Sequence, residues 1–161
     1  MNKSILKLAI PNIISNITIP LLGLVDMILM GHLGSAIYIG AIALGGTIFS
    51  VLYSFFSFLR AGTTGFTAQS LGNDDKTEII YSLYRSVYIG IPIILLILIL
   101  QIPIAKISSL LLDGSDEVKS LAITYFYVRI WAAPANILLY CLNGWFVGMQ
   151  NTKIPMFIAI L

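Results

Sequence analysis

Residues 86–105 read SVYIGIPIILLILILQIPIA and contain no charged side chain. A helix needs about 20 residues to cross the ~30 Å hydrocarbon core of a bilayer, and this stretch supplies them. Strands of a membrane barrel alternate between polar and apolar residues over about 10 positions, whereas Ile91 to Leu100 is continuously apolar. The stretch is therefore predicted to be a membrane-spanning helix, which satisfies its own backbone hydrogen bonds.

Three further charge-free runs indicate that the chain crosses the membrane several times. They cover residues 8–25, 27–59 and 130–152, each long enough for a crossing. Hydrophobic residues make up 58% of the 161 residues and charged residues only 10%, against about 25% in a typical soluble protein. So few charges cannot cover a soluble globule, which excludes a soluble enzyme. The predicted fold class is all-α, as a polytopic membrane protein.

The composition also excludes several kinds of partner and several kinds of reactive site. A net charge of +2 is too small to indicate a nucleic-acid partner. One cysteine, Cys141, excludes an intramolecular disulfide and a cysteine-based metal cluster. The single histidine, His32, falls in a predicted turn, so no set of nucleophile, histidine and acid is available. We expect no enzyme activity and no metal centre, with the lipid bilayer as the surroundings.

Turn residues and prolines divide the chain into helices. The predicted helices cover about residues 6–30, 38–71, 76–102, 116–149 and 154–161. Pro103 is expected to end or kink the third helix, and Pro134 to kink the fourth. The basic start of the first helix is also compatible with a signal peptide, although the run is long and contains Pro11 and Pro20.

The charges near the helix ends predict an orientation. Residues 154–161 are too few to cross a membrane, so we expect residues 1–161 to form part of the N-terminal lobe of a longer protein, with its remaining helices as partners. Basic residues near the helix ends favour one side and predict a cytoplasmic N-terminus in the inner or plasma membrane. They are Lys3, Lys7, Lys76, Arg85 and Lys153, against Lys106 and Lys119.

Asp26 is the acid that physical reasoning singles out as a candidate functional residue, because it stands in a predicted apolar helix. A carboxylate at the bilayer centre costs roughly 2.5–3.5 kcal/mol on insertion scales and therefore normally faces a bundle interior. Burial disfavours the charged form, which is what a group that binds and releases protons requires. The alternative is a structural aspartate that pairs with a neighbouring helix or stays hydrated near the surface.

Arg60 and Arg129 are the other charges expected within the membrane. At 1.5 Å per residue Arg60 lies ~30–36 Å below the outer end of its helix, and we expect it to extend to the inner interface. Arg129 lies ~20 Å below the outer end of its own helix, and we expect it to hold the interior of the bundle. Pro11 breaks the hydrogen-bond ladder of the first helix and is either a hinge or a static kink.

Four blocks of sequence resemble the multidrug and toxic compound extrusion (MATE) transporters, in particular the branch related to DNA-damage-inducible protein F. They occur in the order expected for that family and cover nearly the whole chain. The blocks are Pro11 to Asp26 followed by GHLG at 31–34, FLRAGTTGFTAQ at 58–69, RIWAAPA at 129–135 and GMQNTKIP at 148–155.

The resemblance implies an antiporter of twelve helices in two six-helix lobes, whose central cavity opens alternately to each side. Asp26 matches the first-helix aspartate held to couple transport to a cation, and Pro11 matches the proline about which that helix is thought to bend. The coupling ion would be a proton or sodium, with no other cofactor. The family's N-x-x-x-D pattern in the next helix lies beyond Leu161.

Three functions are compatible with these features. The first is a proton- or sodium-driven exporter of small amphipathic or cationic compounds, in which Arg129, Pro134 and Arg60 have cavity or structural roles. The second is a flippase for lipid-linked precursors or oligosaccharides, which should show several basic residues in its cavity. The third is a non-transporting membrane module, whose activity would not depend on cations.

Overall fold

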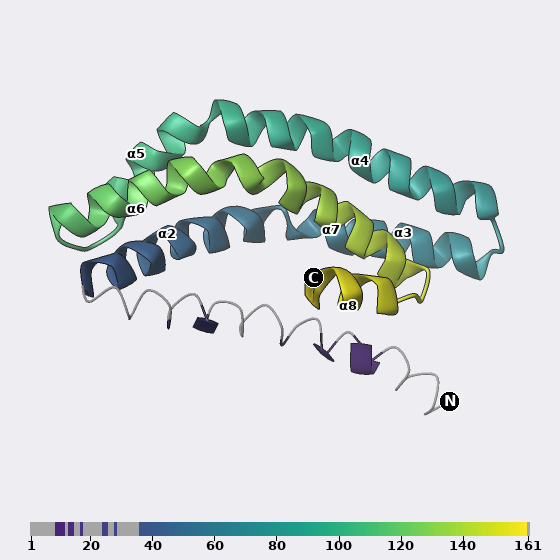
Figure 1. The fold of residues 1–161 in the computed structure, drawn as a ribbon. Coiled ribbons are helices and arrows are strands. Elements are labelled where there is room, and N and C mark those ends of the chain that lie inside the picture. Colours follow the sequence, from purple (N-terminus) through teal and green to yellow (C-terminus); the bar gives the residue numbers. More distant parts are fainter. Residues whose placement is uncertain are drawn as a thin grey trace.

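A computed structural model describes residues 36–160 and, near the N-terminus, residues 9–11, 13, 14, 17, 24, 25 and 28. Asp26, Pro20 and His32 lie outside the described residues. The described part of the chain is helical and contains no strand (Figure 1). Its elements are α2 (Ala36–Phe55), α3 (Ser57–Gly72), α4 (Lys76–Ile99), α5 (Gln101–Leu111), α6 (Asp116–Arg129), the 3-10 turn η1 (Ile130–Ala132), α7 (Ala133–Gly148) and α8 (Lys153–Ile160).

Three helical runs among these residues are long and apolar enough to cross a membrane: Ile37–Gly72, Lys76–Ile99 and Asp116–Gly148. Large apolar side chains of α4 point outward, and Ile99 is 73% exposed. An exposed apolar surface of this kind is typical of a face that contacts lipid or other helices. The prediction of an all-α, membrane-embedded protein is thereby confirmed.

The run of residues 38–71, predicted as one helix, is broken at Phe56. There the amide of Phe56 bonds to the carbonyl of Tyr53, and Leu59 to that of Phe56, which are the short bonds of a 3-10 turn. Ser54 and Ser57 each donate a side-chain hydrogen bond to the carbonyl three residues earlier. Such bonds compete with the helical ladder, and they explain a break that contains neither glycine nor proline.

The third predicted helix also ends earlier than expected. α4 stops at Ile99 and α5 begins at Gln101, so Pro103 lies in the first turn of α5. A proline there cannot donate to the carbonyl four residues before it, that of Ile99, and the helix breaks at Leu100. Pro92, by contrast, lies inside α4 without ending it.

The helices pack as one pair, α2 with α6, and one group of three, α3, α4 and α7, which share one core. α2 lies along α6, while α3 lies against both α7 and α4 (Figure 1). Close approach of α3 and α7 depends on glycine: a Cβ on Gly144 would lie 2.6 Å from the Arg60 carbonyl oxygen, and one on Gly148 would lie 2.6 Å from Thr67 Cβ. The core side chains are Ile48, Phe49, Leu59, Ile97, Ala105, Phe126, Ile130, Ala133, Ile137 and Cys141.

Candidate functional site

A polar seam runs along the joint between the α2–α3 and α6–α7 runs, midway along both. We use this name for Tyr53, Arg129, Asn136, Tyr140 and Asn143. The Asn136 amide nitrogen donates to the Tyr53 hydroxyl over 3.2 Å and to the Ala132 carbonyl over 3.1 Å. The rings of Tyr53 and Tyr140 meet edge to face with centroids 6.4 Å apart. The seam therefore gathers hydrogen-bonding groups within otherwise apolar helices.

Asn136, Tyr140 and Asn143 share one face of α7, because residues three and four apart are neighbours on a helix. The Asn143 side-chain oxygen is buried and has no hydrogen-bond partner in the described part of the chain. Leaving a buried acceptor unpaired costs about 1–3 kcal/mol, so Asn143 is a position at which a further partner would stabilise the protein.

Arg129 lies at the α6 end of the seam. Its guanidinium donates to the Tyr125 hydroxyl and stands 5.1 Å from the centroid of the Phe49 ring and 5.4 Å from that of Tyr125. The side chain is exposed and makes no ion pair with a described carboxylate. Aromatic faces thus hold the charge of Arg129 at the α6 end of the seam. Its place in the interior of the complete bundle stays a prediction.

Arg60 lies on α3, near the end of the polar seam that is formed by Tyr140. It is about 18 Å from the C-terminal end of α3. It is half-buried, and it is close enough to Tyr140 to interact with it electrostatically. Its backbone carbonyl accepts a hydrogen bond from Thr64, whose hydroxyl also bonds to the carbonyl of Gly144. Arg60 thus stands beside the tightest contact between α3 and α7.

Pro134 is the second residue of α7, and Ala133 alone separates it from η1. The 3-10 turn lies at the kink that the sequence predicts there, because proline has no amide to continue the ladder. Pro11 is helical and buried. Among the described residues, no group of three or more His, Cys, Asp or Glu side chains is placed to hold a metal ion.

A family model described as MatE matches residues 11–161. The chain belongs to the MatE family. The family predicted from the four sequence blocks is thereby confirmed, and its match begins at Pro11, one of the two residues that the resemblance singled out.

Curated relatives of this MatE chain include DNA damage-inducible protein F of Escherichia coli (strain K12), which is 36% identical over 160 residues, or 99% of this chain and 35% of the relative. The probable multidrug resistance protein NorM of Pasteurella multocida (strain Pm70) is 30% identical over 168 residues, or 99% of this chain and 34% of the relative. The multidrug resistance protein MdtK of Edwardsiella ictaluri (strain 93-146) is 27% identical. The chain spans about a third of the length of these relatives.

Sequence reasoning missed four members of the seam: Tyr53, Asn136, Tyr140 and Asn143. Three of them repeat at spacings of four and three within the charge-free run of residues 130–152, which is a signal for one polar helix face. The spacing does not indicate which helix packs against this face. Tyr53 contacts α7 only because the two long helical runs pack together.

Proposed function

We propose that the full-length protein is a cation-coupled antiporter that exports small amphipathic or cationic compounds by alternating access. Membership of the MatE family, together with relatives named as multidrug resistance proteins, supports export. We place the full-length protein in the inner or plasma membrane, as a multi-pass protein with a cytoplasmic N-terminus. Its remaining helices would complete this lobe and form the second one.

The observation that carries the proposal is the polar seam. Hydroxyl and amide groups in the middle of membrane-spanning helices are retained where they face a partner or a water-filled path. Tyr53 and Tyr140 present aromatic faces, which suit organic cations and flat amphipathic molecules. Asn136 and Asn143 add amide groups that can orient a polar atom.

Asp26 is the group we propose to bind the coupling proton or sodium ion. The acids that the structure describes all stand in loops or at helix starts: Asp74, Asp75, Glu78, Asp113, Asp116 and Glu117. None of these described acids lies in the middle of a membrane-spanning run. Asp26, expected within the apolar first helix about 7 Å below its outer end, is therefore the group in this chain best suited to coupling.

Efflux of a fluorescent organic cation from cells tests the proposal in the full-length protein. Asp26→Asn keeps the shape of the side chain and removes its charge, so efflux should fall to the level of cells without the protein while membrane abundance is unchanged. Asp113→Asn is the matched control, since Asp113 lies in a loop, and it should retain efflux. Proton- or sodium-dependent efflux that persists in Asp26→Asn would remove Asp26 from the mechanism.

The choice of ion is tested in proteoliposomes. Imposed pH and sodium gradients are compared separately at zero membrane potential, and the one that drives uptake of the organic cation identifies the coupling ion. If transport depends on neither the pH gradient nor the sodium gradient, the protein is not a cation-coupled antiporter.

A further inference from the structure

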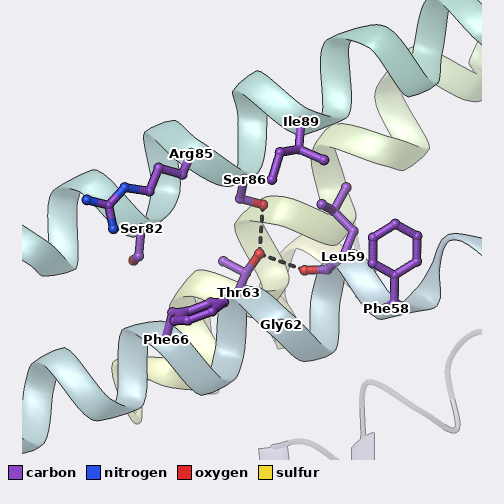
Figure 2. A pocket seen from close by; sticks show the side chains of 9 residues that line it. All are labelled: Phe58, Leu59, Gly62, Thr63, Phe66, Ser82, Arg85, Ser86 and Ile89. Carbon is purple, nitrogen blue, oxygen red and sulfur yellow. Dashed lines mark hydrogen bonds between the residues drawn. The ribbon is translucent and has the colours of Figure 1, made fainter.

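A groove on the outer side of the α3–α4 pair, away from the polar seam, has a volume of about 230 Å³. Figure 2 shows Arg85 at its Ser82 end and Phe58 at the other end. Its apolar walls include Phe58, Phe66 and Ile89, which are 56%, 67% and 50% exposed. Gly62 leaves the floor open, because a Cβ there would meet nothing within 4 Å.

The polar groups at the bottom of the groove are already paired with each other. Thr63 donates to the Ser86 hydroxyl over 2.7 Å and to the Leu59 carbonyl over 2.6 Å (Figure 2). Deeper along the same pair of helices, the hydroxyls of Thr67 and Ser82 are 2.7 Å apart. The groove therefore offers apolar walls along its length and one charged group, Arg85, at its end.

Arg85 stands at the edge of the hydrocarbon. The charge-free run of residues 86–105 begins directly after it, so the guanidinium lies at the level of lipid headgroups whichever way the chain is oriented. Tyr81, Tyr84 and Tyr88 surround it on α4 and are 51%, 67% and 79% exposed. Exposed tyrosines are typical of the membrane–water interface. The Arg85 guanidinium lies 6.0 Å from the centroid of the Tyr81 ring.

A second, more open hollow borders Arg85 on the other side and is lined by Tyr84, Arg85, Tyr88 and Ile89. Arg85 and Ile89 thus form a ridge between two apolar surfaces that start at the same charge. This arrangement fits a molecule with one anionic head and two apolar chains.

We propose that this groove binds an anionic phospholipid, with one acyl chain between Phe58, Gly62 and Phe66 and the phosphate on Arg85. A guanidinium pairs with phosphate through two parallel hydrogen bonds. In this structure the Arg85 guanidinium already donates two such hydrogen bonds to the Glu78 carboxylate, at 2.9 and 3.0 Å. Both partners of this ion pair are solvent-exposed, at 64% and 40%, so the pair is weak and an anionic headgroup can compete with Glu78 for Arg85.

Native mass spectrometry of the full-length protein tests the proposal, with phosphatidylglycerol and phosphatidylcholine of identical acyl chains as probes. The protein should retain phosphatidylglycerol more strongly. Arg85→Gln should lower the affinity for phosphatidylglycerol about tenfold, to that for phosphatidylcholine. Glu78→Gln should raise it, because the competing carboxylate is removed. Equal retention of the two lipids by the unmodified protein, or no effect of Arg85→Gln, would overturn the proposal.

A pair of glycine variants tests the groove itself. Gly62→Leu fills the floor and should lower the binding of both lipids, whereas Gly65→Leu, on the same helix and equally open but outside the groove, should not. Glycerol phosphate, which has the head but no chains, should not displace the lipid; displacement would identify a site for free phosphate instead. Unchanged lipid binding in Gly62→Leu would indicate that another helix of the protein fills the groove, and would also overturn the proposal.

Discussion

The side-chain amide of Asn136 on α7 donates a hydrogen bond to the hydroxyl of Tyr53 on α2, although 83 residues separate them in the chain. This bond links the two long membrane-spanning runs close to the point at which each is irregular, Phe56 in one and η1 in the other. The bond therefore joins the two runs at the level where the regular helical hydrogen bonding of each is interrupted.

The first prediction concerns this bond. Tyr53→Phe removes the acceptor, while Asn136 keeps its bond to Ala132. A hydrogen bond of this kind contributes about 0.5–1.5 kcal/mol, so the thermal stability of the full-length protein in detergent should fall only slightly. If the seam lines the transport path, the efflux rate should fall clearly even though the thermal midpoint barely changes. In a cycle with Asn136→Ala, the effects of the two single variants should not add; strict additivity would mean that the bond is absent in solution.

The second prediction concerns the contact between α3 and α7. Gly148→Ala places a methyl group 2.6 Å from Thr67 Cβ and 2.8 Å from the Thr64 carbonyl oxygen. Overpacking of this kind costs typically 1–3 kcal/mol, and the midpoint of thermal inactivation should fall accordingly. Gly46→Ala is the matched control, because a Cβ there meets nothing within 4 Å. If both variants have the same midpoint, α3 and α7 are not in such close contact.

Much of the fold can be predicted from the sequence because crossing a membrane requires long apolar helices. The run from Ser86 to Ala105 is sufficient for that conclusion. The breaks at Phe56 and Leu100 are less visible. The first depends on serine hydroxyls that bond to their own helix, and the second lies three residues before the proline that causes it.

The candidate site divides in the same way. Asp26 stands out in the sequence because a charge is unusual in an apolar helix, and Pro11 because a proline interrupts the helical hydrogen bonds. Tyr53 and Asn136 are ordinary residues in such helices, and only packing brings them together. For Arg129, the distance along its helix gives a position relative to the membrane but no contact partner. That the guanidinium lies against the rings of Phe49 and Tyr125 follows only from the packing of α2 on α6.

The third prediction concerns Pro11, the proposed hinge of the first helix. Proline removes one hydrogen bond of the helical ladder and clashes with the carbonyl four residues before it, which makes bending there cheaper than elsewhere. Pro11→Ala restores the bond and should stiffen the helix. Turnover of the full-length protein should slow severalfold, while equilibrium binding of a fluorescent substrate stays nearly unchanged. Normal turnover in Pro11→Ala would move the hinge elsewhere, with Pro20→Ala as the next variant to measure.

The last prediction concerns the charge balance of transport. Moving one charge through 100 mV is worth about 2.3 kcal/mol, and a tenfold proton gradient about 1.4 kcal/mol. If Asp26 binds one proton for each monovalent cation exported, the two charge movements cancel and the membrane potential contributes nothing. One pH unit then sustains only about a tenfold substrate gradient. A second coupling acid, such as one in the remaining helices, would add a proton and make transport electrogenic.

We expect electroneutral exchange, because none of the described acids lies deep in a membrane-spanning run. The measurement uses proteoliposomes of the full-length protein with a potassium potential set by valinomycin and no pH gradient. Uptake of the organic cation should be the same at zero and at 100 mV, whereas a pH gradient of one unit should drive it at either potential. Asp26→Asn proteoliposomes supply the leak under each condition, and strong uptake driven by potential alone would exclude one-for-one exchange.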